Sequence, residues 1–275
     1  MSLTSADPIH QRTVELAREQ RLVEATGPRG AASFVWGDFV TAPGTTVAGA
    51  AGRWSPPADG RAGLVVEATA GEGVRIGGQL VDGTAVLFLH PEDGETAAQF
   101  ADGAEGVLFS YDQASFALQV WNPAIAADRG FAGIAAYPVD PSWVAPAAIA
   151  PVAPGRTVVI AHHRDPRPVE VPVVAEARFH RDGAPHRLVA SAGLEPGELL
   201  LHFTDATTGG ETSGSGRVLR IAEDATVLDF NLAGLLPCSF SPAWNCPLPP
   251  AENRLPVPVR AGERTVVDAN GETIE

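Results

Sequence analysis

The chain has 275 residues, 45% of them hydrophobic, which is enough for one large or two ordinary domains with packed cores. All 19 basic residues are Arg and the net charge is −14, a field that repels phosphate backbones, so we expect no nucleic-acid partner. No stretch approaches the roughly 20 apolar residues of a membrane helix, and the N-terminus lacks a signal-peptide pattern, so we expect no membrane partner and a cytoplasmic location.

The N-terminal segment, residues 1–32, is predicted to hold a single helix and a linker. Asp7 is a suitable N-cap, and Pro8 fits the first helical position. Gly27 and Pro28 then predict that the helix ends near Thr26. Few residues of this helix are apolar, so we expect it to dock on the surface of a domain.

Residues 33–123 alternate short apolar runs with Asp-Gly pairs. Asp-Gly supports the positive φ angles of tight hairpins. Such pairs begin at Asp59, Asp82, Asp93 and Asp102. Short antiparallel strands joined by these turns predict a first β domain, a sandwich or a partly open barrel. The expected strands are residues 34–40, 64–68, 84–89, 107–111 and 116–121.

Four prolines, at 123, 138, 141 and 146, predict that residues 124–152 form an extended proline-rich joint. Strand patterns resume in residues 153–265, which we predict to be a second antiparallel β domain, and residues 266–275 are predicted to be a polar tail. The expected strands of the second domain are residues 157–162, 169–174, 177–180, 186–192, 198–203, 218–221, 227–230 and 256–260.

Polar residues with definite chemistry gather between residues 202 and 263. Asp205 follows an apolar strand, and Arg217 begins the strand that returns from a Gly-rich turn. If these strands pair as a hairpin, the carboxylate and the guanidinium meet, and the next strand ends at the same edge. A stiff loop of residues 237–250, with five prolines, is expected to roof this edge. The predicted ligand-binding residues are Asp205, Thr207, Arg217, Asp229, Asn231 and Asn253.

The histidines and cysteines point to no metal and no cofactor. His162 and His163 are adjacent, so on a strand they face opposite sides and cannot chelate one ion. Seven residues separate Cys238 from Cys246, whereas zinc knuckles space their cysteines by two to four. We therefore assign both cysteines a structural role, either as small buried thiols or as a bridge that closes the loop.

Several motifs of this chain resemble a domain-of-unknown-function family, number 1684, of bacteria and archaea. The matching segments are Asp205-Ala-Thr with Gly216-Arg217, Asp229-Phe-Asn, Pro237-Cys and Cys246-Pro-Leu-Pro-Pro, Ala261-Gly-Glu, and Tyr137-Pro-Val-Asp-Pro-Ser-Trp. The resemblance implies a family and a fold but no reaction. By the same resemblance, residues 33–123 are similar to a forkhead-associated sandwich, although the Arg of a phosphopeptide reader is missing from the early loop, which favours a structural role.

The chain departs from the family pattern inside the predicted site. Ser213 stands where the family has Tyr, and residues 232–236 replace an Arg-Ala-Tyr-Asn-Pro segment. If the family has an activity, these departures predict its loss or a change of ligand in this member.

The sequence therefore predicts an all-β protein of two antiparallel β domains with a short N-terminal helix. The favoured function is non-catalytic binding of a small polar or anionic molecule in a pocket of the second domain. One alternative is a hydrolase that uses Asp205 or Asp229 as a base. Another is a protein-interaction scaffold that works through the first sandwich. The sequence leaves the oligomeric state and the ligand open.

Overall fold

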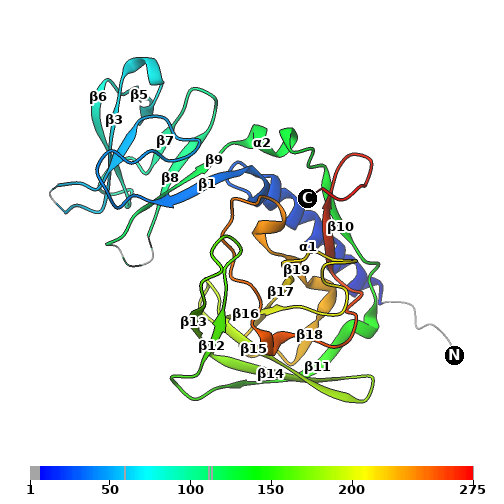
Figure 1. Cartoon of the computed structure of the whole chain (residues 1–275). Helices are drawn as coiled ribbons and strands as arrows, with labels where there is room; N and C mark the ends of the chain where they lie inside the picture. The colour runs from blue at the N-terminus through cyan, green and yellow to red at the C-terminus, as the bar shows by residue number, and fades with distance from the viewer. Residues whose placement is uncertain (1–6, 59, 111, 113, 275) are drawn as a thin grey trace. The chain divides into compact units, whose positions relative to one another are not determined.

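The computed structural model describes residues 7–274 except 59, 111 and 113 (Figure 1). The first six residues of the N-terminal segment, the turn residue Asp59 and Tyr111 of an expected strand lie outside the described residues. The protein is mostly β, with 39% strand and 16% helix. This confirms the prediction of an all-β protein with a short N-terminal helix. None of the helices in the described part is long and apolar enough to cross a membrane.

The chain divides into two compact units: residues 24–129, called here the middle unit, and residues 1–23 with 130–275, called the C-terminal unit. The middle unit has a six-stranded sheet in the order β1-β9-β8-β7-β4-β5 and a three-stranded sheet in the order β2-β3-β6. Its elements are β1 (Phe34–Phe39), β2 (Arg53–Ser55), β3 (Gly63–Ala68), β4 (Arg75–Ile76), β5 (Gln79–Leu80), β6 (Gly83–Phe88), β7 (Ala97–Gln99), β8 (Glu105–Phe109), β9 (Ala117–Trp121) and α2 (Pro123–Asp128).

Alternating side chains of both sheets form the core of the middle unit. Leu64 and Val66 of β3 are fully buried, as are Leu118 and Val120 of β9. This period of two is what a strand with one buried face requires. The Asp102-Gly103 pair makes the turn between β7 and β8, where Gly103 has a φ of 84° that other residues rarely adopt.

Residues 124–152, expected to be an extended joint, instead contain much of α2 and all of β10 (Gly133–Ala136) and β11 (Val144–Pro151). Two of the prolines, Pro123 and Pro141, start helical turns because a capping side chain precedes each of them. The Asn122 side chain accepts a hydrogen bond of 3.0 Å from the amide of Ala124, and Asp140 caps the turn at Pro141 in the same way. Proline at the first helical position costs no hydrogen bond.

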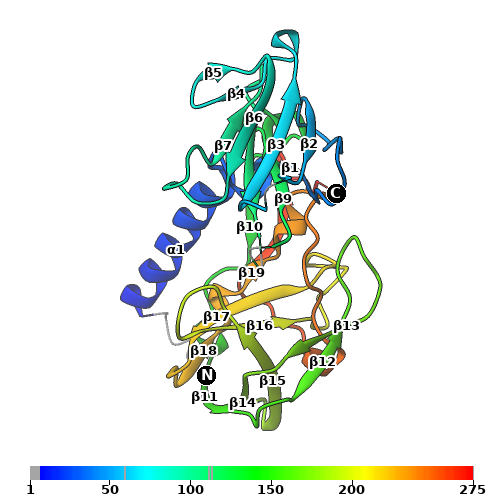
Figure 2. The same ribbon diagram turned by 90° about the vertical axis from the view of Figure 1, so that its left-hand side faces the viewer.

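The C-terminal unit is built on a seven-stranded antiparallel sheet in the order β18-β11-β14-β15-β16-β17-β19, which curves into a half-barrel. Figure 2 lets the eye follow the sheet from β17 and β16 through β15 to β14. Two ribbons, β10-β20 and β12-β13, complete the unit. The bounds are β12 (Thr157–Ile160), β13 (Val169–Pro172), β14 (Ala175–Arg181), β15 (Ala184–Ala192), β16 (Glu198–Phe203), β17 (Arg217–Ala222), β18 (Val227–Asp229), β19 (Gly234–Leu235) and β20 (Glu263–Val267).

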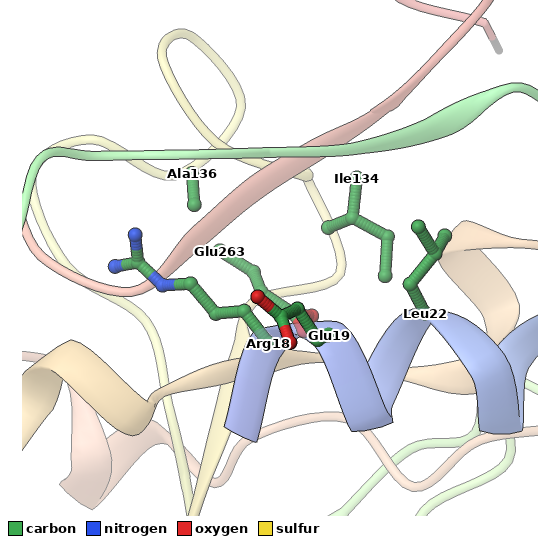
Figure 3. Close-up of a pocket in the computed structure, with 6 residues that line it drawn as sticks. All are labelled: Arg18, Glu19, Leu22, Ile134, Ala136 and Glu263. Atoms are coloured by element: carbon green, nitrogen blue, oxygen red, sulfur yellow. The ribbon is translucent and has the colours of Figure 1, made fainter. Parts of the chain in front are cut away.

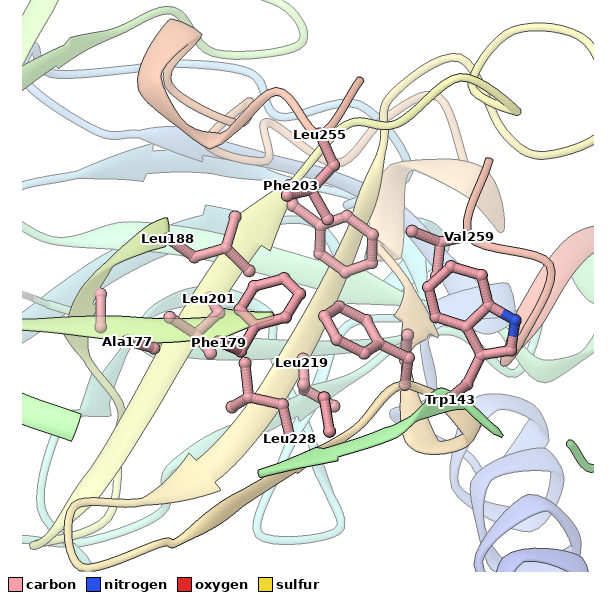
Figure 4. Packing of buried hydrophobic residues seen from close by; sticks show 14 of the residues in the cluster. Trp143, Ala177, Phe179, Leu188, Leu201, Phe203, Leu219, Leu228, Leu255 and Val259 are labelled. Atoms are coloured by element: carbon pink, nitrogen blue, oxygen red, sulfur yellow. The ribbon is translucent and has the colours of Figure 1, made fainter. Parts of the chain in front are cut away.

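Aromatic and aliphatic side chains fill the concave side of this sheet (Figure 4). Leu201 and Phe203 of β16 are fully buried there, together with Leu219 of β17. The rings of Phe203 and Phe230 meet edge to face, with centroids 5.7 Å apart. Fully burying side chains of this kind stabilises the folded state by about 1.5–3 kcal/mol each, so the half-barrel is a packed core.

The helix α1 (Pro8–Thr26) matches the predicted bounds, and its residues up to Val23 belong to the C-terminal unit. His10 Nε2 lies 2.7 Å from Asp229 Oδ2, and Arg21 Nη2 donates to the carbonyl of Leu235 over 2.9 Å. The buried side chain of Val14 lies between these two anchors along the helix. A helix at the start of the chain is thus tied to residues more than two hundred positions away.

The last predicted strand, residues 256–260, is wrong. Pro256 and Pro258 lack the amide hydrogens that a central strand donates, so the segment forms no ladder. The final strand is β20, which pairs with β10 and extends into the segment predicted to be the polar tail. The carbonyls of residues 259, 261 and 263 have a different use, described next.

Candidate functional site

The structure brings Asp205 and Arg217 together in the interior of the C-terminal unit. β16 and β17 pair antiparallel with Phe203 opposite Arg217, so Asp205 lies beside the start of β17. Arg217 Nη2 donates to Asp205 Oδ2 over 2.6 Å, and the two side chains are 1% and 0% exposed. This is a fully buried ion pair.

Every nitrogen of the Arg217 guanidinium except Nε has a partner. Nη2 also donates to the carbonyl of Val259 over 2.7 Å, and Nη1 donates to the carbonyls of Ala261 and Glu263. Val259 lies in the segment that forms no strand, Ala261 follows that segment, and Glu263 is the first residue of β20. Arg217 therefore cross-links β17 to residues 259–263, and it presents no fork of free donors to a ligand.

The Asp205 carboxylate is equally occupied. Its Oδ1 accepts hydrogen bonds from the Thr207 amide over 2.6 Å and from the Thr207 hydroxyl. Thr207 Oγ1 also lies 3.0 Å from Thr212 Oγ1. Three of the residues predicted to bind a ligand, Asp205, Thr207 and Arg217, thus hydrogen-bond to one another at the Gly-rich turn. A network of this kind stabilises the fold.

Asp229 and Asn231 form a second network. Asp229 Oδ1 accepts from the amide and from Nδ2 of Asn231, at 3.0 and 2.8 Å. Asn231 also exchanges two hydrogen bonds of 2.9 Å with the backbone of Asp140. Among the described residues, no hydrogen bond joins this network to Asp205 or Arg217, so the two halves of the predicted site form separate hydrogen-bond networks.

Asn253 lies apart from both networks. Its side chain is buried, donates to the carbonyls of Val189 and His202 over 2.8 and 2.7 Å, and accepts from the Val189 amide over 2.7 Å. It joins the 3₁₀ turn η6 (Ala251–Asn253) to β15 and β16. All of its polar atoms have partners within the protein.

The cysteine part of the proline-rich loop packs on the opposite side of β17 from Arg217. Cys238 and Cys246 are buried free thiols in a cluster with Val218 and Leu236. Consecutive residues of a strand face opposite sides, so Val218 and Arg217 cannot share a roof. The loop of residues 237–250 was expected to roof Arg217, but its cysteine part lies on the other side of β17, and carbonyls of residues 259–263 contact Arg217 instead.

A cavity of about 220 Å³ lies elsewhere in the C-terminal unit, between α1 and the β10-β20 ribbon (Figure 3). Arg18, Glu19 and Leu22 of α1 line one side of it. Ile134 and Ala136 of β10 line the other, and Glu263 of β20 completes it. Leu22 follows Arg18 by one helical turn, so both face the same ribbon.

Arg18 differs from the other lining residues because two of its donors are unused. Its Nε and Nη2 atoms are buried and have no hydrogen-bond partner among the described residues. Burial lowers the pKa of Arg18, against the opposing attraction of Glu263, Asp229 and Glu15. Nε and Nη2 form one edge of the guanidinium, the edge that binds a carboxylate with two parallel hydrogen bonds.

Glu263 connects the cavity to the Arg217 network. Its Oε2 accepts from the Leu235 amide over 2.6 Å, and Oε1 lies 3.5 Å from Arg21 Nε, while its backbone carbonyl accepts from Arg217. Burial raises the pKa of Glu263, and Arg21 is the strongest opposing influence. The preceding Gly262 has a φ of 77°, and a Cβ there would lie 2.4 Å from the Ala233 carbonyl, so only glycine fits.

A further charged cluster lies at the end of the Gly-rich turn. Tyr137 Oη donates to Glu211 Oε2 over 2.9 Å, and Arg260 donates to both oxygens of the same carboxylate. The hydrogen bonds from Arg260, followed by the one from Tyr137, lower the pKa of Glu211 to about 2. The charges of Glu211 and Arg260 cancel each other, and both side chains are about half exposed. Among the described residues, no group of three or more His, Cys, Asp or Glu is arranged to hold a metal ion.

Fold and networks together define a two-unit antiparallel β protein whose motif residues hold the half-barrel closed. Residues 129–264 match the model of the family described as "Protein of unknown function (DUF1684)". An uncharacterized protein of Haloarcula marismortui, solved by solution NMR, is 33% identical over 52% of this chain and 81% of its own, with a TM-score of 0.42. The comparison with curated proteins gave no match. The chain belongs to the DUF1684 family, as its motifs predicted.

The sequence did not predict that Arg18 and its neighbours line a cavity. The spacing of Arg18 and Leu22 was the only signal, and it is ordinary for a docking helix. The cavity forms only where α1, β10 and β20 pack against one another, and no local pattern in the sequence predicts this contact.

Proposed function

We propose that the C-terminal unit binds a small monocarboxylate with a short aliphatic chain in the cavity between α1 and β10. The observation that carries this proposal is the unused Nε–Nη2 edge of Arg18 beside a cavity with an apolar far end. The proposal keeps the favoured function, non-catalytic binding of a small anionic molecule. It moves the site from Arg217 to Arg18.

Electrostatics supports a ligand at this position. A buried donor without a partner costs about 1–3 kcal/mol, and more when the group is charged. A carboxylate that accepts from both nitrogens removes this cost and adds two charge-assisted hydrogen bonds. The ligand thus supplies the partner that Arg18 lacks.

The size of the cavity and the charges of its lining residues restrict the class of ligand that it can bind. At about 30 Å³ per water molecule, the cavity has the space of roughly seven waters, which suits a carboxyl group with a few carbons. Leu22, Ile134 and Ala136 offer the chain an apolar wall. Glu19 and Glu263 also line the cavity, so a second negative charge on the ligand is disfavoured.

The two alternatives have less support. Asp205 is fully engaged with Arg217 and Thr207, and Asp229 with Asn231 and His10, so neither carboxylate is available as a hydrolytic base. A scaffold role for the middle unit needs a contiguous apolar patch, whereas its exposed large apolar residues in the described part are Phe39 and Leu80, on separate strands.

Isothermal titration calorimetry with straight-chain acids from ethanoate to hexanoate tests the proposal. We expect an optimum at an intermediate chain length, with a Kd of roughly 1 mM or tighter, and weaker binding of butanedioate than of butanoate. Arg18→Gln should weaken binding at least tenfold. Arg167→Gln, which makes the same change at a side chain that is 84% exposed, should leave it unchanged. Equal affinities for all three proteins would exclude the Arg18 site.

A further inference from the structure

Cys238 and Cys246 lie against each other at the base of the proline-rich loop. The Cys238 amide, in the 3₁₀ turn η5 (Pro237–Ser239), donates a hydrogen bond to Cys246 Sγ over 3.1 Å. Both thiols are free, and the residues are only 8% and 5% exposed. The fold therefore presents two reduced sulfurs side by side, which neither the Arg217 network nor the Arg18 cavity uses.

The surroundings of the two sulfurs are unequal. Hydrogen bonds from the Cys246 thiol and from Ser215, set against burial, lower the pKa of Cys238 to about 7. The pKa of Cys246 is raised, because its proton is held by the Cys238 sulfur and because it is buried. Cys238 therefore loses its proton more readily than Cys246, which makes it the better nucleophile of the pair.

We propose that this pair is a reversible oxidation site, at which a peroxide converts Cys238 and Cys246 into an intramolecular disulfide. The Cys238 thiolate attacks one oxygen of hydrogen peroxide, the O–O bond breaks, and the departing hydroxide takes a proton to become water. Cys246 then attacks the sulfur of the resulting sulfenic acid, the S–O bond breaks, and the hydroxide leaves with the thiol proton as a second water. The two sulfurs lose two electrons, and the peroxide gains them.

The bridge would close a short ring that other segments already hold. The Ala243 carbonyl inside that ring accepts from Arg164 Nη1 over 2.8 Å, and the Cys246 carbonyl accepts from the His163 amide over 2.9 Å. These contacts tie the ring to the connection between β12 and β13. Oxidation would therefore fix the loop and this connection together, and it should raise the Tm by roughly 5 °C through the smaller entropy of the unfolded chain.

The test uses the full chain in its native state, treated with a small excess of hydrogen peroxide. Intact mass should fall by about 2 Da, both cysteines should become inert to iodoacetamide, and a dithiol reductant should restore them. Chains that instead gain oxygen at each sulfur separately, or that lose thiols only after denaturation, would overturn the proposal.

Two single variants test the order of events. Cys246→Ser should accumulate a sulfenic acid at Cys238 that dimedone traps, whereas Cys238→Ser should react at least tenfold more slowly. The opposite order would overturn the roles assigned to the two sulfurs. If either variant fails to fold, peptide mapping of the wild-type chain at partial oxidation decides instead. Dimedone adducts on Cys238 support the proposal, and adducts mainly on Cys246 contradict it.

Discussion

Two arginines of the C-terminal unit, the buried Arg217 and the partly buried Arg18, differ in the partners of their buried nitrogens. Arg217 is 1% exposed, and it shares its charge with Asp205 and with the carbonyls of residues 259–263. Arg18 lies at a cavity, and two of its buried nitrogens donate to nothing among the described residues. The first arginine resides in the family motif, whereas the second lies in a helix that precedes the matched segment.

The contrast shows why burial alone does not identify a binding site. A buried charge paired with a counter-charge and several carbonyls, as at Arg217, holds segments together, and removing it leaves those partners unsatisfied. A buried charge without partners costs stability until something else supplies them. The hydrogen-bond partners of a buried arginine distinguish a structural role from a binding role better than its position in a motif does.

The largest effect is expected at the structural arginine. Arg217→Ala removes a buried ion pair and leaves the Asp205 carboxylate without its counter-charge, so the free energy of unfolding should fall by about 3–5 kcal/mol. Urea denaturation followed by Trp fluorescence measures this change. Arg167→Ala, at an exposed side chain, should stay within about 0.5 kcal/mol of wild type. A wild-type denaturation midpoint for Arg217→Ala would show that the network does not hold the fold.

Asn253 should come next. Asn253→Ala breaks three buried hydrogen bonds and leaves backbone groups of Val189 and His202 unsatisfied, which should cost about 2–3 kcal/mol. Carboxylate affinity should be unchanged, since Asn253 does not line the cavity. A variant of normal stability with lost binding would reverse the interpretation and return Asn253 to a ligand site.

A smaller, pH-dependent effect is expected at Glu263. Burial raises its pKa above the ordinary value of 4.5, so the folded protein binds this proton more tightly than the unfolded chain does. The associated stability is present below pH 4.5 and is lost as the pH rises through the folded pKa. Glu263→Gln removes that loss, so the stability of the variant relative to wild type should increase between pH 4.5 and 7. Parallel urea titrations at several pH values measure the difference, and a constant offset would contradict the prediction.

Arg18→Gln should have the smallest effect on stability. The side chain gives up no hydrogen bond from Nε or Nη2, so without ligand the free energy of unfolding should fall by no more than about 0.5 kcal/mol. With saturating butanoate, wild type should gain stability by mass action and the variant should not. A loss above about 2 kcal/mol in the free variant would mean that Arg18 is a structural residue like Arg217.

Local chemistry made part of this structure predictable. Asp7, Pro8 and Gly27 set the bounds of α1, and the Asp7 side chain accepts from the Ile9 amide over 3.0 Å. The prediction that Asp205 and Arg217 meet depends only on the pairing of the two strands that flank one turn. In both cases the signal lies within about twenty residues of what it predicts.

The remainder depends on contacts between distant segments. Nothing near Asp229 indicates that its carboxylate meets His10, 219 positions earlier in the chain. The prolines at 256 and 258 excluded a strand, but the use of the carbonyls at 259 and 261 by Arg217 follows only from the tertiary fold. The cavity likewise needs three segments that are far apart in sequence.

The most direct test observes both arginines at once. In ¹⁵N-labelled protein, the Nε–H signals of Arg18 and Arg217 can be followed while butanoate is added. We predict that the Arg18 signal shifts and saturates, because Nε gains an acceptor, and that the Arg217 signal stays fixed, because Arg217 does not line the cavity. An Arg18 signal that does not move while butanoate binds, or an Arg217 signal that moves first, would contradict the assignment of the site to Arg18.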